Sequence, residues 1–137
     1  MVCFASDPNL GTWKLNEAKS KIPAGASKNT NVVYTMEGDK YKCVVDGVDG
    51  AGKPAHNEWV GAFDGKDYAL KGDPSADTRA IKQVSPNMYS LSNKKGGKET
   101  TSGSITLSAD GKTRKVSSVS SVPGGKKVNV TFVYDKQ

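Results

Sequence analysis

Hydrophobic residues alternate with polar residues in short groups along most of this chain. The alternation is clearest near the C-terminus, at Val128, Val130, Phe132 and Tyr134. Because successive side chains of a strand point to opposite faces of a sheet, such groups predict strands with one buried face. No long segment keeps apolar residues at the spacing of helical turns. The pattern therefore predicts an all-β protein with little or no helix.

Turn sequences divide the chain into about ten strands. Glycine, asparagine, aspartate and proline supply the backbone conformations that hairpins require, and they recur at 38–39, 64–65, 85–87 and 109–111. The strands predicted between the turns cover 10–16, 29–37, 40–47, 54–63, 66–71, 77–84, 87–94, 98–108, 112–122 and 126–135. Such strands suit a sandwich or an up-and-down barrel, and closure leaves no exposed edge. We therefore expect a single antiparallel up-and-down β-barrel.

In such a barrel the tight turns share one end, and the other end carries the longer connections. These connections are 17–28, 48–53, 71–76, 94–98 and 123–126. Short hairpins close an end and longer loops leave room for entry, which predicts a cup with a closed base and an open mouth. Chance variation in loop length is the alternative. Five lysines fall at the predicted mouth: Lys94, Lys95, Lys98, Lys126 and Lys127. They form either a rim that attracts anions or an ordinary solvated face.

The length of 137 residues suits one domain, which we place at 9–137. Residues 1–8 are either the remnant of a signal peptide or an ordinary start. Cys3 and Cys43 would form one disulfide in an oxidising compartment or stay reduced. No apolar stretch approaches the roughly 18 residues that span a bilayer. We expect a soluble, secreted or periplasmic protein that does not insert into membranes.

The net charge of +6 is carried mainly by lysine, since the chain has only two arginines, Arg79 and Arg114. Lysine-rich surfaces usually serve solubility. Nucleic-acid binders tend to concentrate arginine and aromatic residues on one patch, and only 7% of this chain is aromatic. We therefore expect no nucleic-acid partner, and a monomer or weak dimer.

The run Gly11-Thr12-Trp13-Lys14-Leu15 resembles the Gly-x-Trp signature that opens the first strand of calycins, the lipocalins and fatty-acid-binding proteins. With Ala18-Lys19-Ser20-Lys21, the chain also looks like small lipocalin-like domains of secreted bacterial proteins. The resemblance implies a small-molecule barrel in which Trp13 packs near the base and Arg114 lies across its indole, a structural pair. The chain departs from the family in lacking a helical lid, a C-terminal helix and a Thr-Asp-Tyr signature. Its ten predicted strands also exceed the eight of lipocalins.

Arg79 is the first candidate for a ligand anchor. It begins a strand at the predicted mouth and shares the inward face with Ile81, where a guanidinium suits a carboxylate or phosphate. The alternatives are exposure to solvent or pairing with Asp73 or Asp77. Aromatic rings and inward hydroxyls would either line a cavity or pack as core. These further candidates are Tyr34, Trp59, Phe63, Tyr68, Tyr89, Ser118, Ser120, Phe132 and Tyr134.

His56 is the only histidine and the one residue singled out for catalysis. It would act as an acid or base with Glu58 beyond it, or hold haem iron; otherwise it is a polar strand residue. Tyrosines are the alternative acid–base groups. The segment Asp46–Gly50 lacks the closing glutamate of a calcium loop, and no metal spacing or nucleophile motif occurs. We expect a carrier of a small, partly apolar anion without a cofactor. An enzyme acting on a hydrophobic substrate, a haem-binding barrel and a solid structural barrel are the alternatives.

Overall fold

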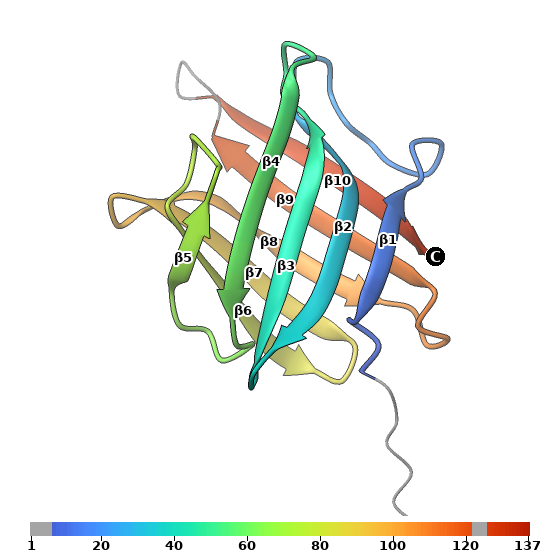
Figure 1. The fold of residues 1–137 in the computed structure, drawn as a ribbon. Helices are drawn as coiled ribbons and strands as arrows, with labels where there is room; N and C mark the ends of the chain where they lie inside the picture. Colours follow the sequence, from blue (N-terminus) through green and yellow to red (C-terminus); the bar gives the residue numbers. More distant parts are fainter. Residues whose placement is uncertain (1–6, 122–125) are drawn as a thin grey trace, which may run out of the picture.

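The computed structural model describes residues 7–121 and 126–137, and these residues form ten strands and no helix (Figure 1). The strands are β1 (Gly11–Leu15), β2 (Lys28–Glu37), β3 (Lys40–Val48), β4 (Pro54–Gly61), β5 (Tyr68–Lys71), β6 (Thr78–Ser85), β7 (Met88–Lys95), β8 (Lys98–Leu107), β9 (Thr113–Ser121) and β10 (Lys127–Lys136). Each lies within a few residues of its predicted position. The prediction of an all-β chain is confirmed.

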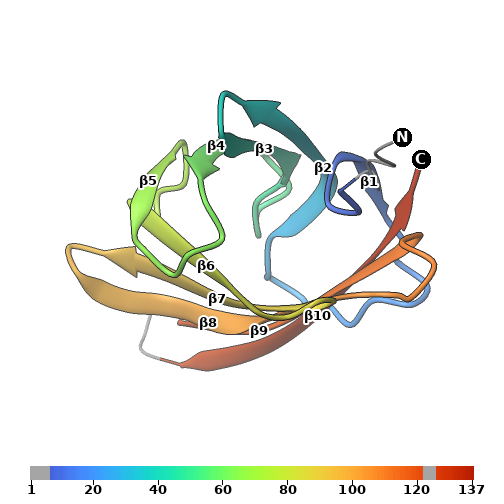
Figure 2. The ribbon, with the colours of Figure 1, turned by 90° about the horizontal axis from the view of Figure 1, so that it is seen from below.

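The strands close into one antiparallel up-and-down barrel. Each strand pairs with its neighbours in sequence, and β1 pairs with both β2 and β10, which joins the first strand to the last. Viewed from below, the strands form a ring with β1 to β5 along one side and β6 to β10 along the other (Figure 2). The predicted topology is therefore confirmed, and every inward side chain faces one common interior.

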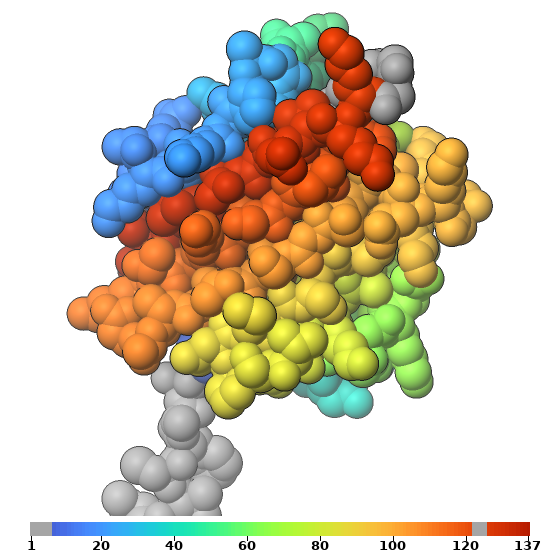
Figure 3. Space-filling model, turned by 180° about the vertical axis from the view of Figure 1, so that it is seen from behind, coloured from blue at the N-terminus to red at the C-terminus, as the bar shows by residue number. Residues whose placement is uncertain are grey.

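The connection at 16–27 lies against the barrel instead of standing free. After β1 ends, the Lys21 amide donates to the Thr131 carbonyl at 2.7 Å, and the Thr131 amide donates back at 2.9 Å. The neighbouring Ser20 hydroxyl accepts a hydrogen bond from the backbone amide of Val133, also on β10. Figure 3 shows this blue segment beside the red β10. Its last residues are thereby held at the open end of the barrel.

The base of the barrel is filled by aromatic rings around Phe63. The ring of Tyr41 stacks on Phe63 with centroids 4.0 Å apart, and Tyr89 meets it edge-on at 5.1 Å. Trp59 and Tyr34 lie at 6.4 Å from the same ring. Such offset and edge-to-face pairs stabilise a core beyond the area that they bury. The interior is therefore closed at this end.

Asn9 ties the chain before β1 into this base. Its side chain is 2% exposed and donates to the Tyr89 hydroxyl at 2.9 Å, while its amide oxygen accepts from Arg114 at 3.3 Å. Its backbone carbonyl accepts from the Trp13 indole at 3.1 Å. The Asp7 carboxylate accepts a hydrogen bond from the backbone amide of Asn9 at 2.9 Å. Residues from Asp7 onward therefore belong to the barrel, and residues 1–6 lie outside the described part.

Trp13 is buried at the base, as the calycin resemblance implies, but Arg114 does not lie across it. The Arg114 guanidinium lies over the Tyr34 ring at 4.7 Å, and the Lys136 ammonium lies 5.2 Å from the Trp13 ring. The register of β1 and β10 places Trp13 directly opposite Lys136. Hydrogen bonds to Tyr34 and Asn9 direct Arg114 elsewhere, so this part of the expectation is wrong.

The loop-length difference between the two ends is smaller than predicted. The connection expected at 94–98 is a tight turn at Gly96 and Gly97, whose positive φ angles of 58° and 83° favour glycine. At the base, the turn expected at 64–65 is part of a longer connection at 62–67. The longest connections at the open end are the segments 16–27 and 72–77.

Candidate functional site

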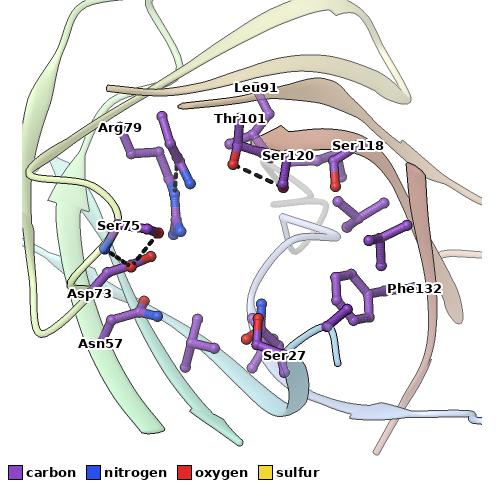
Figure 4. Close-up of a pocket in the computed structure, with 18 of the residues that line it drawn as sticks. Ser27, Asn57, Asp73, Ser75, Arg79, Leu91, Thr101, Ser118, Ser120 and Phe132 are labelled. Carbon is purple, nitrogen blue, oxygen red and sulfur yellow. Dashed lines mark hydrogen bonds between the residues drawn. The ribbon is translucent and has the colours of Figure 1, made fainter. Parts of the chain in front are cut away.

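A cavity of about 280 Å³ occupies the half of the barrel nearest the open end (Figure 4). It is lined by inward side chains of the strands and by the segments 25–27 and 73–75. This volume is near the lower end of the range for small-molecule pockets. The barrel is therefore hollow above its aromatic base.

One wall of the cavity is largely apolar. At its centre are Phe132 and three valines of β9 and β10, which are Val116, Val128 and Val130. Ile81, Leu91 and Ile105 extend this wall. Ser118 and Ser120 continue the inward row of β9 beyond Val116, as predicted, and the Ser120 hydroxyl lies 3.0 Å from that of Thr101. The wall thus presents hydrocarbon groups to the cavity, and hydroxyl groups border it.

Arg79 of β6 reaches into the cavity, as predicted (Figure 4). Its Nε donates to Asn93 Oδ1 at 2.9 Å, which orients the guanidinium. Neither alternative carboxylate pairs with it: Asp73 accepts hydrogen bonds from Ser75, and Asp77 accepts from the β7–β8 turn. Within the described residues, its terminal nitrogens have no protein acceptor. The charge of Arg79 is therefore available to a bound molecule.

Arg114 forms part of the cavity floor and is only 4% exposed. It donates to the Tyr34 hydroxyl at 2.8 Å and to Asn9, both neutral groups. Among residues 7–121 and 126–137, no carboxylate lies within ion-pair distance of it. A buried charge without a counter-charge is costly to fold around. We expected only a structural role for Arg114, because the resemblance directed it to Trp13.

The other titratable groups of the floor do not offset these two charges. Burial raises the pKa of Tyr34 and of Tyr134 well above the usual range, although the charge of Arg114 opposes the shift. Burial likewise raises the pKa of the Cys43 thiol, which also lines the cavity. These groups are neutral near pH 7, so the floor keeps a net positive charge. Whether Cys43 forms a disulfide with Cys3 stays open, because Cys3 lies outside the described residues.

Four of the predicted candidates lie away from the cavity: Trp59, Phe63, Tyr68 and Tyr89. Phe63 is at the centre of the aromatic base, and the Trp59 indole donates to the Arg79 carbonyl at 2.9 Å. The Tyr68 hydroxyl donates to Asp64 at 2.7 Å. The structure does bring Tyr34, Ser118, Ser120 and Phe132 to the cavity with Arg79. Alternation in sequence indicates which face a residue occupies, but it does not give its depth along the barrel.

His56 lies on the outer surface of β4, outside the residues that line the cavity. Its Nδ1 is 2.6 Å from Asp46 Oδ1, and its Nε2 is 3.2 Å from Glu58 Oε2. Hydrogen bonds to these two carboxylates raise the pKa of the imidazole. The described residues contain no group of three or more histidine, cysteine or acidic side chains arranged to hold a metal ion. His56 therefore does not line the cavity in which a substrate of the acid–base alternative would lie, and it stands outside the lining at the barrel mouth where the haem alternative would place it.

The predicted lysine rim is partly neutralised. Lys94 pairs with Asp67 at 3.1 Å, and the Lys95 ammonium donates to the Pro74 carbonyl at 2.6 Å. Lys98, Lys126 and Lys127 are exposed. A positive rim therefore remains, but it is weaker than the sequence suggests.

Asn57 of β4 is a cavity residue that the sequence analysis did not identify. Its Oδ1 is buried, and no described residue donates a hydrogen bond to it. It shares the inward row of β4 with Trp59, so the alternation around that tryptophan was the available signal.

The fold and the cavity define the class: a closed ten-stranded antiparallel barrel with an interior pocket, consistent with a calycin-like architecture. No known family model matches the chain, and no curated protein matches it either. In the described part of the chain, no helix has the length and apolar character needed to cross a membrane.

Proposed function

We propose that this protein is a carrier that binds a small, partly apolar anion inside its barrel. The observation that carries the proposal is that two guanidinium groups without carboxylate partners, Arg79 and Arg114, line one cavity with an apolar wall. A bound anion would pair directly with these guanidinium groups, which no described carboxylate does; Asp73 lines the same cavity, but it accepts its hydrogen bonds from Ser75.

The cavity matches such a ligand in both size and polarity. A charge-assisted hydrogen bond from Arg79 would contribute about 1.5–3 kcal/mol. Each methylene of the ligand that moves from water to the wall around Phe132 adds about 0.8 kcal/mol. An acid with a short hydrocarbon chain would use both contributions at once.

The location and the ancestry form a further part of this proposal. We propose a secreted or periplasmic protein related to bacterial lipocalin-like domains, on the strength of the Gly11–Leu15 signature and the barrel that contains it. No observation favours the enzyme or haem alternatives, because His56 lies on the outer face.

The proposal is tested by calorimetric titration with decanoate and with the uncharged 1-decanol. We expect decanoate to bind more tightly than decanol. Arg79→Gln should weaken decanoate binding by about tenfold or more, since it removes a charge-assisted contact, and should leave decanol binding unchanged. Lys126→Gln is the matched control, because it removes one exposed positive charge at the open end without a contact in the cavity.

Two results would contradict the proposal. One is a decanoate affinity no greater than that of decanol in the wild-type protein. The other is equal loss of decanoate affinity in Arg79→Gln and Lys126→Gln, which would assign the effect to long-range attraction alone.

A further inference from the structure

We propose that the bound anion carries a second oxygen group near the middle of its carbon chain, and that the Ser118 hydroxyl recognises this group. The inference rests on the proposed function and specifies the chemical class of its ligand. Ser118 lines the cavity and is 9% exposed, and its hydroxyl has no hydrogen-bond partner within the described residues. Among those residues, Asn57 Oδ1 is the one buried polar side-chain atom that is both unpaired and closed to water. The unpaired Ser118 oxygen is therefore open to the cavity.

The strands on either side of Ser118 offer its hydroxyl no partner. The register places Gly103 of β8 directly opposite it, and Val130 of β10 opposite it on the other side. Neither residue has a polar side chain. The next inward hydroxyl of β9, that of Ser120, lies 3.0 Å from the Thr101 hydroxyl and is already paired. Because a buried hydroxyl ordinarily has a hydrogen-bond partner, Ser118 is positioned to bond a molecule in the cavity.

Arg79, which would bind the acid group, lies farther along the same wall. It is opposite Asn93 of β7, and its Nε donates to the Asn93 side chain at 2.9 Å, which holds the guanidinium beside β7. One strand, β8, separates β7 from β9. Neighbouring strands are about 4.8 Å apart, so Asn93 and Ser118 are roughly 10 Å apart along the wall. Figure 4 shows Arg79 and Ser118 on this wall, with Leu91 between them.

A molecule that bonds both residues needs two polar groups separated by several carbon atoms. Leu91 faces that hydrocarbon spacer, because it is opposite Gly103, which is itself opposite Ser118. A serine hydroxyl both donates and accepts hydrogen bonds, so the second polar group is a hydroxyl or a keto oxygen. The ligand class is thus a carboxylic acid with a hydroxyl or keto oxygen in the middle of its chain.

The test compares four acids by calorimetric titration: decanoate, 2-hydroxydecanoate, 6-hydroxydecanoate and 6-oxodecanoate. We expect at least one of the two 6-substituted acids to bind about threefold or more tightly than decanoate, since one neutral hydrogen bond changes affinity by about that factor. The acid that does so distinguishes a hydroxyl from a keto oxygen. In 2-hydroxydecanoate the hydroxyl is too close to the acid group to reach Ser118, so this acid should bind no better than decanoate.

Ser118→Ala removes one oxygen atom and, within the described residues, no hydrogen bond between side chains, so the barrel should still fold. The variant should reduce the preference for the 6-substituted acid to below about threefold and leave decanoate affinity unchanged. Ser117→Ala is the matched control. It makes the same change one residue earlier on β9, outside the residues that line the cavity, and it should keep the preference.

A preference below threefold for both 6-substituted acids would overturn the inference, and would show that water satisfies Ser118. A preference that survives in Ser118→Ala, or that is lost equally in Ser117→Ala, would overturn it as well. So would equal affinities for 2-hydroxydecanoate and the preferred 6-substituted acid. These outcomes are distinct from failure of the proposed function, in which decanoate binding itself is absent or independent of Arg79.

Discussion

Asn9→Ala tests whether the short segment before β1 stabilises the barrel. The substitution removes the side-chain amide that bonds Tyr89 and Arg114, but it keeps the backbone carbonyl that accepts from Trp13. Because Asn9 is almost fully buried, water does not readily replace the lost partners. Arg114 would then keep a single hydrogen bond within the described residues, to Tyr34.

The expected loss of stability follows from these contacts. The neutral hydrogen bond to Tyr89 contributes about 1 kcal/mol, and the bond from the charged Arg114 contributes about 1.5–3 kcal/mol. The 3.3 Å length of the Arg114 bond favours the lower part of that range. We therefore expect the free energy of unfolding to fall by about 3 kcal/mol. For a chain of this size, the melting temperature should fall by roughly 10 °C.

Urea unfolding followed by tryptophan fluorescence measures this change. Trp13 reports directly on the base, because its indole bonds to Asn9. Asn129→Ala is the matched control, since Asn129 is exposed on β10, and it should change the free energy of unfolding by less than about 0.5 kcal/mol. If Asn9→Ala lowers the free energy of unfolding by less than about 1 kcal/mol, the inference that the hydrogen bonds of Asn9 stabilise the base is refuted.

Two further predictions concern the wall and the outer surface. Gly103→Ala should lower the free energy of unfolding in urea by about 1–3 kcal/mol, because the added methyl carbon would lie 2.2 Å from the Ser117 carbonyl oxygen; unchanged stability would contradict this. His56 should titrate above its ordinary pKa of 6.5 by NMR, and Asp46→Asn or Glu58→Gln should lower that pKa. The stabilisation from the charged imidazole is present below the unfolded-state pKa and is lost as pH rises through the folded-state pKa; identical titrations in all three proteins would contradict the assignment.

The strands were predictable because their signal is local. Alternation and turn residues gave all ten strands, and they placed Arg79, Ser118 and Phe132 on the inward face. Depth along the barrel was not predictable, because it depends on the tilt and register of paired strands; Phe63 is therefore in the base and not in the cavity.

The partners of Arg114 were not predictable for a different reason. Its contacts with Asn9 and Tyr34 join residues separated by 105 and 80 positions in the chain, and no local pattern encodes such a choice. Arg114 belongs to the part of the site that only tertiary packing defines.

The aromatic rings around Phe63 give the barrel a blind end. If the proposed carrier function holds, a molecule bound above these rings would leave through the same opening by which it entered. Binding and release would then use the same opening. The residence time of a bound molecule would depend on the segments 16–27 and 72–77 at that opening.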